Sequence, residues 1–188
     1  MSSIVIIHGS PTPGSRLNGL IEFVESNLQE KGIEITHVQV AELPAEALLR
    51  ANFKDESIIA AVGKVEAATG VVIASPVYKA SFTGVLKAFI DLLPQKGLQG
   101  KAALPLFIGG TISHLLSLDY ALKPVLSVLG SRNILGGVFA IDSWVTRLEG
   151  GGFELADELR DRLTNAADEL AEEIEWLDKR SQAKAETK

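Results

Sequence analysis

Groups that can hold an anion are concentrated in one short loop near the N-terminus. Ser10, Thr12, Ser15, Arg16 and Asn18 all lie between a short apolar run and the first stretch of helical periodicity. A helix N-terminus offers unpaired N–H groups and a partial positive charge, and Arg adds forked donors. The loop can therefore saturate the three acceptor oxygens of a phosphate monoester without a metal. The alternative is that Ser15 only caps the helix while glycine and proline shape a turn.

Other chemistries lack the residues they require. Gly9 and Gly14 have the spacing of a nucleoside triphosphate P-loop, but Ser15-Arg16 stands where Lys followed by Ser or Thr is needed. The glycine fingerprint of dinucleotide-binding proteins and the Gly-x-Ser-x-Gly turn of serine hydrolases are both absent. The chain has no Cys and only three scattered His, so we expect neither a thiol nucleophile nor a metal site. A mononucleotide with a terminal monophosphate remains as the expected ligand.

Two further loops follow apolar runs in the same way. Tyr78 could lay its ring or backbone along a planar ligand, and paired glycines let a backbone approach a flat ring closely. Their N–H groups can donate to ring carbonyls such as those of an isoalloxazine; ordinary turn chemistry is the alternative for either loop alone. The residues concerned are Pro76, Val77, Tyr78 and Lys79 in the first loop, and Gly109, Gly110, Thr111 and Ser113 in the second.

The elements that position these loops alternate between strands and helices. Apolar runs bounded by Gly, Pro or Ser predict buried strands at Ile4–Ile7, Val71–Ala74, Ala103–Ile108 and Leu135–Ile141, with an edge strand at Glu34–Val40. Apolar residues at helical spacing predict helices at Arg16–Lys31, Ser57–Ala68, Gly84–Leu93 and Ser113–Leu129, with a last helix from about Phe153. Ser81 or Thr83 is placed to cap the helix that opens at Gly84.

This alternation predicts an α/β protein with a doubly wound, five-stranded parallel sheet and helices on both faces. Strand order 2-1-3-4-5 is a common solution, and ligands of such sheets bind outside the carboxyl ends of the strands, where the order switches. We expect a single domain over residues 1–180 and a polar tail over residues 181–188.

Composition excludes several partners. The chain has 188 residues and a formal net charge of −6, so nothing draws its whole surface to nucleic acid or anionic lipid. No run of about 18 apolar residues could span a bilayer, and the N-terminus has no basic region before its apolar run. We therefore expect a cytoplasmic protein with neither a nucleic-acid nor a membrane partner.

Several motifs together resemble the NADPH-dependent FMN reductase family, which has a flavodoxin-like fold. They are Gly9-Ser10-Pro11, Ser15-Arg16, Ser75-Pro76-Val77-Tyr78-Lys79, Gly84-Val85-Leu86-Lys87, Asp91-Leu92-Leu93-Pro94, Leu98-Gln99-Gly100-Lys101 and Gly109-Gly110-Thr111. His114-Leu115-Leu116 and the segment from Asp119 to Leu126 are similar to those of family members that serve alkanesulfonate monooxygenases.

The resemblance assigns roles to the three loops. It implies that Ser10, Ser15, Arg16 and Asn18 hold the FMN phosphate, that the loop from Pro76 lines the flavin, and that the glycine-containing loop lies near the pyrimidine side of the ring. Relatives often carry Arg at the position of Thr12. Its replacement here favours weaker, exchangeable FMN binding.

The resemblance also implies a function for Tyr120. In the sulfonate-linked relatives the matching Tyr lies in a π-type segment at the oligomer interface and accompanies use of flavin as a substrate. Otherwise Tyr120 is an ordinary, partly buried helix tyrosine. Pro124 independently predicts a local irregularity in this helix.

The expected protein is thus a homodimeric or homotetrameric reductase that uses FMN with NADPH, or NADH, and supplies reduced flavin to a monooxygenase, in sulfonate desulfonation. The alternatives are a quinone or azo reductase with tightly bound FMN and a flavodoxin-type electron carrier.

Overall fold

The computed structural model describes residues 2–186 and contains eight strands in that range. The strands are β1 Ser3–His8, β2 Glu34–Gln39, β3 Gly70–Pro76, β4 Ala102–Gly109, β5 Asn133–Ile134, β6 Val138–Ile141, β7 Val145–Arg147 and β8 Phe153–Leu155.

The main sheet is parallel and has the order β2-β1-β3-β4-β5, with β6 also paired to β4. The predicted order 2-1-3-4-5 is therefore confirmed. The register pairs His8 with Ala74, and Pro76 with Ile108, so β1, β3 and β4 end along one edge. The three loops predicted to bind a ligand consequently leave the sheet side by side.

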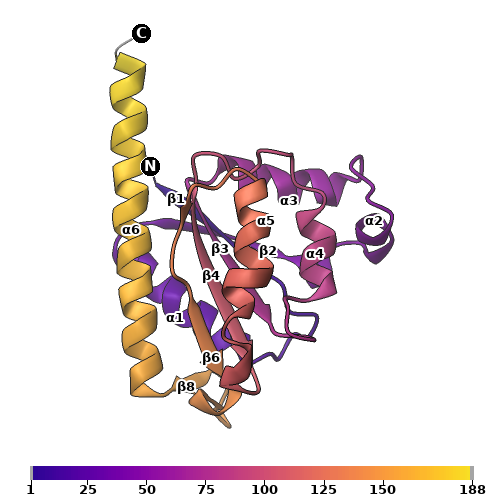
Figure 1. Ribbon diagram of the computed structural model, residues 1–188, viewed down its shortest axis with the longest axis vertical. Helices are drawn as coiled ribbons and strands as arrows, with labels where there is room; N and C mark the ends of the chain where they lie inside the picture. Colours follow the sequence, from indigo (N-terminus) through magenta and orange to yellow (C-terminus); the bar gives the residue numbers. More distant parts are fainter. Residues whose placement is uncertain (1, 187–188) are drawn as a thin grey trace.

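Helices cover both faces of this sheet (Figure 1). The α-helices are α1 Leu17–Glu30, α2 Ala45–Leu49, α3 Glu56–Ala67, α4 Gly84–Ile90, α5 Lys123–Val128 and α6 Asp157–Glu186. Short 3₁₀ segments are η1 Val40–Glu42, η2 Ile112–His114 and η4 Asp142–Trp144, and η3 Leu118–Leu122 is a π-helix. Helices α1 and α6 lie on one face, and α3, α4 and α5 lie on the other.

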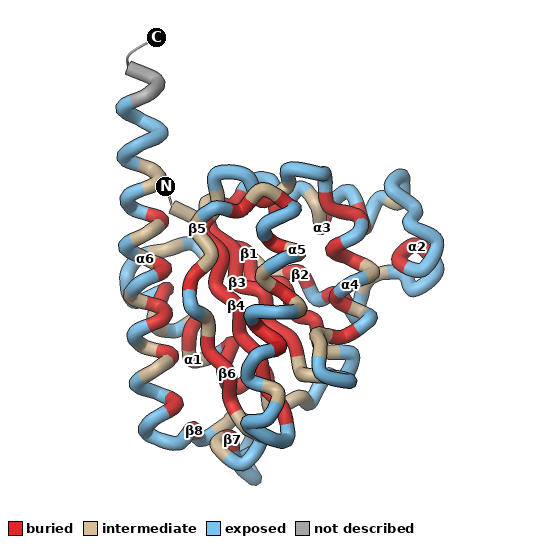
Figure 2. Tube along the Cα trace, in the orientation of Figure 1, coloured by how far each residue is buried: buried red, intermediate tan, exposed pale blue. Residues whose placement is uncertain are grey.

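Two apolar cores result, one on each face, and strands β1, β3, β4 and β6 between them are buried throughout most of their length (Figure 2). Ile4 and Ile6 of β1 face α1 and α6, whereas Val5 and Ile7 face the opposite helices, because side chains alternate along a strand. Burial on both sides explains why these strands are continuous apolar runs rather than alternating patterns.

Three predicted elements need correction. The strand expected at Leu135–Ile141 is replaced by two short strands, β5 and β6, because the backbone turns at Gly137, where φ is +81° and a Cβ would lie 2.8 Å from the Pro105 carbonyl oxygen. Phe153 belongs to β8, which pairs antiparallel with β7, so the last helix begins only at Asp157. The helix expected at Ser113–Leu129 is divided among η2, η3 and α5.

Helix α6 continues past the body of the protein and includes residues 181–186 of the segment expected to be a polar tail (Figure 1). Residues 187–188 lie outside the described residues. Within residues 2–186, no helix combines the length and the apolar character needed to cross a bilayer.

Candidate ligand site at the carboxyl edge of the sheet

The loop between β1 and α1 is held in a compact turn by its own side chains. Ser10 Oγ donates to the Thr12 carbonyl at 3.1 Å and accepts from the Thr12 N–H at 3.2 Å. Ser15 Oγ accepts from the N–H of Leu17, the first residue of α1, at 3.2 Å, and Asn18 Nδ2 donates to the Pro13 carbonyl at 2.7 Å. The hydroxyls that we expected to hold an anion therefore lie in one turn, and that of Ser15 also accepts a bond from the first N–H of α1.

Backbone donors in this loop remain available. Among residues 2–186, the N–H groups of Ser10, Gly14 and Arg16 have no hydrogen-bond partner. A Cβ added to Gly14 would meet no atom within 4 Å, so the space beside it is open. The first turn of α1 contains no acidic residue that would repel an anion. Unpaired donors, open space and a helix N-terminus are the features that an anion site requires.

The loop is also tied to the β7–β8 hairpin. Arg16 Nε donates to the Val145 carbonyl at 3.0 Å. In the opposite direction, Arg147 donates to the Gly14 carbonyl through Nε at 3.1 Å and through Nη2 at 2.7 Å. The sequence predicted Arg16 but not Arg147, because no local pattern places a residue of a late hairpin beside the first loop.

The loop after β3 contains a strained turn. Tyr78 and Ser81 exchange backbone hydrogen bonds of 2.8 and 3.2 Å, and between them Lys79 and Ala80 have φ of +52° and +60°. Left-handed geometry at two successive residues is usually supplied by Gly, Asn or Asp. The Val77 N–H donates to the Ile108 carbonyl at 2.8 Å, which anchors this loop against the end of β4. The turn leaves Tyr78 exposed at the sheet edge.

The loop after β4 approaches its neighbours closely at Gly109 and is open at Gly110. A Cβ at Gly109 would lie 3.2 Å from the Phe139 ring, whereas at Gly110 its nearest neighbour would be the Asp142 carboxylate at 3.8 Å. Thr111 Oγ1 accepts from the Ser113 N–H at 3.3 Å. In the described chain the N–H groups of Gly110 and Thr111 have no partner, so this loop too offers free donors.

Thr83 connects the loops to one another. Its Oγ1 donates to the Gly9 carbonyl at 2.5 Å and accepts from the Leu86 N–H at 3.1 Å, and its N–H donates to Ser75 Oγ at 3.0 Å. Of the two caps considered for α4, Thr83 is therefore the correct one. The first loop is fixed to the end of β3 by a buried residue whose donors and acceptors are all used.

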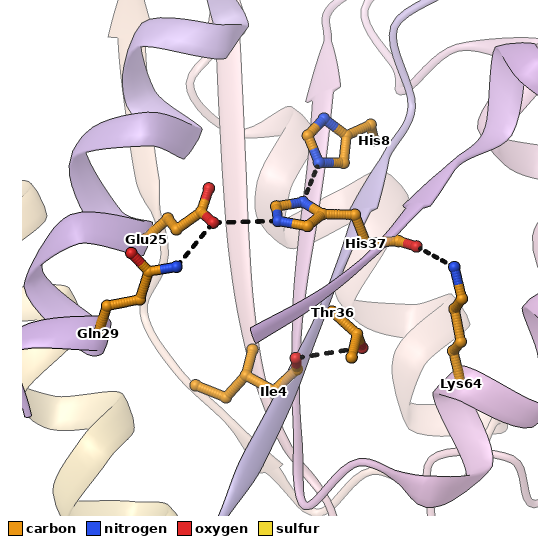
Figure 3. Close-up of polar contacts among 7 residues, drawn as sticks. All are labelled: Ile4, His8, Glu25, Gln29, Thr36, His37 and Lys64. Atoms are coloured by element: carbon orange, nitrogen blue, oxygen red, sulfur yellow. Dashed lines mark hydrogen bonds and ion pairs between the residues drawn. The ribbon is translucent and has the colours of Figure 1, made fainter. Parts of the chain in front are cut away.

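A chain of polar side chains lies beside the end of β1 (Figure 3). His8 Nε2 and His37 Nδ1 share a hydrogen bond of 2.9 Å, and His37 Nε2 lies 3.1 Å from Glu25 Oε1 on α1. Burial, with a smaller contribution from His37, lowers the pKa of His8 to about 4. Sequence reasoning missed this cluster, since its members are separated along the chain and meet only through the pairing of β1 with β2. Within residues 2–186 no group of acidic and His side chains is suited to hold a metal ion.

The helix after β4 exposes apolar side chains. Its π-helical segment includes Tyr120, as the resemblance implied, and Pro124 follows where its missing N–H disturbs the helical pattern. Tyr120 is 80% exposed, so its interpretation as a partly buried helix tyrosine is wrong. Ile112 and Leu116 are also more than half exposed.

A cavity of about 560 Å³ lies away from these loops, at the amino ends of β4 and β5. Its lining includes Lys96, Lys101 and Arg132. It shares no residue with the three loops predicted to bind the ligand.

A parallel sheet between two helical layers, with donor-rich loops at the carboxyl edge beside the switch in strand order, defines a flavodoxin-like nucleotide-binding protein. The sequence profile of the NADPH-dependent FMN reductase family matches residues 2–146. The chain therefore belongs to this family of oxidoreductases.

Individual relatives agree. The chain is 46% identical over 147 residues to an FMN reductase (NADPH) of Pseudomonas putida KT2440, which covers 78% of this chain and 75% of the relative. It is also 44% identical over 142 residues to an FMN reductase (NADPH) of Escherichia coli K12, and this match covers 76% of this chain and 74% of that relative. The apo form of the NADH:FMN oxidoreductase EMOB superposes with a TM-score of 0.82 at 38% identity, which covers 90% of this chain and 88% of that one.

Proposed function

We propose that this protein reduces FMN with NADPH and releases the reduced flavin to a flavin-dependent monooxygenase. The observation that carries the proposal is the set of unpaired backbone donors on the loops after β1 and β4, in a chain of the FMN reductase family.

The first loop fits the FMN phosphate. This loop and the start of α1 contribute three unpaired N–H groups, the hydroxyls of Ser10 and Ser15, and the Arg16 side chain, and the space beside Gly14 is open. A phosphate monoester carries nearly two negative charges and three acceptor oxygens. The donors present match that demand in number and in sign. Thr12 and Asn18 belong to the same turn and are proposed to stabilise its shape, because their polar groups bond within it.

The other two loops fit the flavin ring. The unpaired N–H groups of Gly110 and Thr111 suit ring carbonyl acceptors, and the exposed side of Tyr78 suits a planar surface. Bound FMN would supply hydride chemistry at its ring nitrogen N5, with nicotinamide as the hydride donor. The protein needs only to position the two rings and exclude water, which is consistent with a site that contains no obvious acid–base pair.

Two features support a flavin that is exchanged as a substrate rather than held permanently: the first loop and the helix after β4. Thr12 is neutral where relatives often carry Arg, and the loop is open beside Gly14. The π-helix at Tyr120 matches the feature that the resemblance connects with flavin used as a substrate. Reduced flavin that leaves the site would serve a monooxygenase, and the resemblance favours one that acts on sulfonates.

A second copy of the chain is the proposed occupant of the exposed apolar face formed by Ile112, Leu116 and Tyr120. Exposed large apolar side chains on one face mark interaction sites more often than isolated ones do. This face leads directly from the flavin-binding loop after β4, so assembly through it would place the interface beside the site.

The test is NADPH oxidation, followed by its absorbance, with and without added FMN. We expect oxidation that depends on free FMN and a purified protein that is nearly colourless. A yellow protein that oxidises NADPH and passes electrons to quinones or azo dyes would favour the alternative reductase. A yellow protein that leaves NADPH unchanged would favour an electron carrier, and replacing NADPH by NADH measures the nucleotide preference.

A further inference from the structure

Arg147 reaches the proposed phosphate loop from the β7–β8 hairpin, 133 residues further along the chain. It belongs to β7, one residue beyond the segment matched by the family profile. Its two hydrogen bonds to the Gly14 carbonyl hold the guanidinium against this turn. The position is fixed by a fork of two donors on one acceptor, a geometry that restricts the rotation of the group.

The guanidinium retains unused donors and charge. An Arg side chain has five N–H donors, and the Gly14 carbonyl engages only two of the nitrogens that carry them. In the described part of the chain, no carboxylate forms an ion pair with either Arg147 or Arg16. The exposed Arg147 thus brings an uncompensated positive charge to a turn that contributes only one cation of its own.

The two arginines at this turn are arranged reciprocally. Arg16, at the start of α1, donates to β7, and Arg147, on β7, donates to the loop. The loop and the hairpin are therefore held together, and both cationic groups are bound at the loop whose Gly14 and Arg16 N–H groups are unpaired. Two cations and several amide donors match the charge of a phosphate dianion better than one cation does.

We propose that Arg147 is a second cationic ligand of the flavin phosphate and makes the site selective for FMN over riboflavin. The proposal rests on the function proposed above. In this chain, where Thr12 supplies no charge, the second positive charge comes from the hairpin that follows the sheet. A nicotinamide nucleotide also carries phosphate groups, so the experiment must distinguish the two sources.

The experiment compares Arg147→Ala and Arg147→Lys with the wild-type protein. Flavin binding is measured directly, by quenching of flavin fluorescence, for FMN and for riboflavin, and KM is measured for FMN, NADPH and NADH. We expect Arg147→Ala to weaken FMN binding about 10- to 100-fold, as for loss of a charged hydrogen bond, and to leave riboflavin binding within about twofold. Arg147→Lys should recover part of the loss, because it keeps the charge but not the fork. The control is Arg132→Ala, which removes an exposed charge at the opposite edge of the sheet and should change neither FMN binding nor riboflavin binding.

Three results would overturn the proposal. Unchanged FMN binding in Arg147→Ala would show that the group does not reach the phosphate. Equal losses of FMN binding in Arg147→Ala and Arg147→Lys would show that Arg147 only supports the shape of the loop, because the lysine keeps the charge and loses the forked bond to Gly14. A rise in KM confined to NADPH would assign it to the phosphate of the nucleotide. Wild-type protein that bound no FMN at all would instead refute the proposed function, so the two failures are distinguishable.

Discussion

His8 makes the stability of the fold depend on pH, because it is buried in its neutral form. Its pKa is about 4 in the folded protein and 6.5 in its ordinary, solvent-exposed state. Between these values the unfolded chain binds a proton that the folded chain does not, so the free energy of unfolding falls as the pH is lowered from about 6.5 to about 4. The difference of 2.5 pKa units lowers the free energy of unfolding by about 3 kcal/mol once the pH is below both values, and by about 2 kcal/mol already at pH 5.

The perturbation is His8→Gln, which keeps a polar side chain beside His37 but cannot titrate. The assay is urea unfolding of both proteins at pH 5 and pH 8. When the pH is lowered from 8 to 5, we expect the free energy of unfolding to fall by about 2 kcal/mol more in the wild-type protein than in the variant, whatever the variant's absolute stability. Equal losses in the two proteins would refute the reasoning, since they would show that His8 does not carry the pH dependence.

Three further predictions concern the loops. Ala80→Gly should stabilise the protein by about 1 kcal/mol in urea unfolding, because Ala80 has φ of +60°. The control Ala60→Gly, on the exposed face of α3, should destabilise the protein by a similar amount. A destabilised Ala80→Gly variant would contradict the strained turn. Thr83→Ala should lower the free energy of unfolding by about 2 to 3 kcal/mol, because it removes the cap of α4 and the bond to the Gly9 carbonyl. Thr83→Ser keeps the hydroxyl and should retain most of this stability. Equal stability of the two variants would exclude the hydroxyl as the cause. Tyr120→Ala should purify with more bound FMN, visible as yellow colour, and a colourless variant would remove the link between the π-helix and flavin exchange.

The sheet and its three loops could be predicted because their signals are local. Buried parallel strands are short apolar runs, and glycine, proline and hydroxyl residues mark the loops that follow them. Once strands 1, 3 and 4 were assigned, the topology alone brought Ser10, Tyr78 and Gly110 to one edge.

The remaining features depend on contacts that the sequence does not display. Phe153–Leu155 has apolar spacing compatible with a helix, but pairing with β7 makes it a strand. The meeting of His8 with His37 requires the register of β1 against β2, and the bond from Arg147 to Gly14 requires the hairpin to fold back onto the first loop. Tertiary contacts therefore override local preference at these positions.

The reciprocal bonds of Arg16 and Arg147 join partners that are 129 and 133 residues apart in the chain. The turn at the start of α1 is thus among the first segments to leave the ribosome and among the last to gain its full support. Until the hairpin has been synthesised, that turn has its sequence but lacks two of the contacts that define its shape. The proposed ligand site is consequently complete only in the finished chain and not in its N-terminal half.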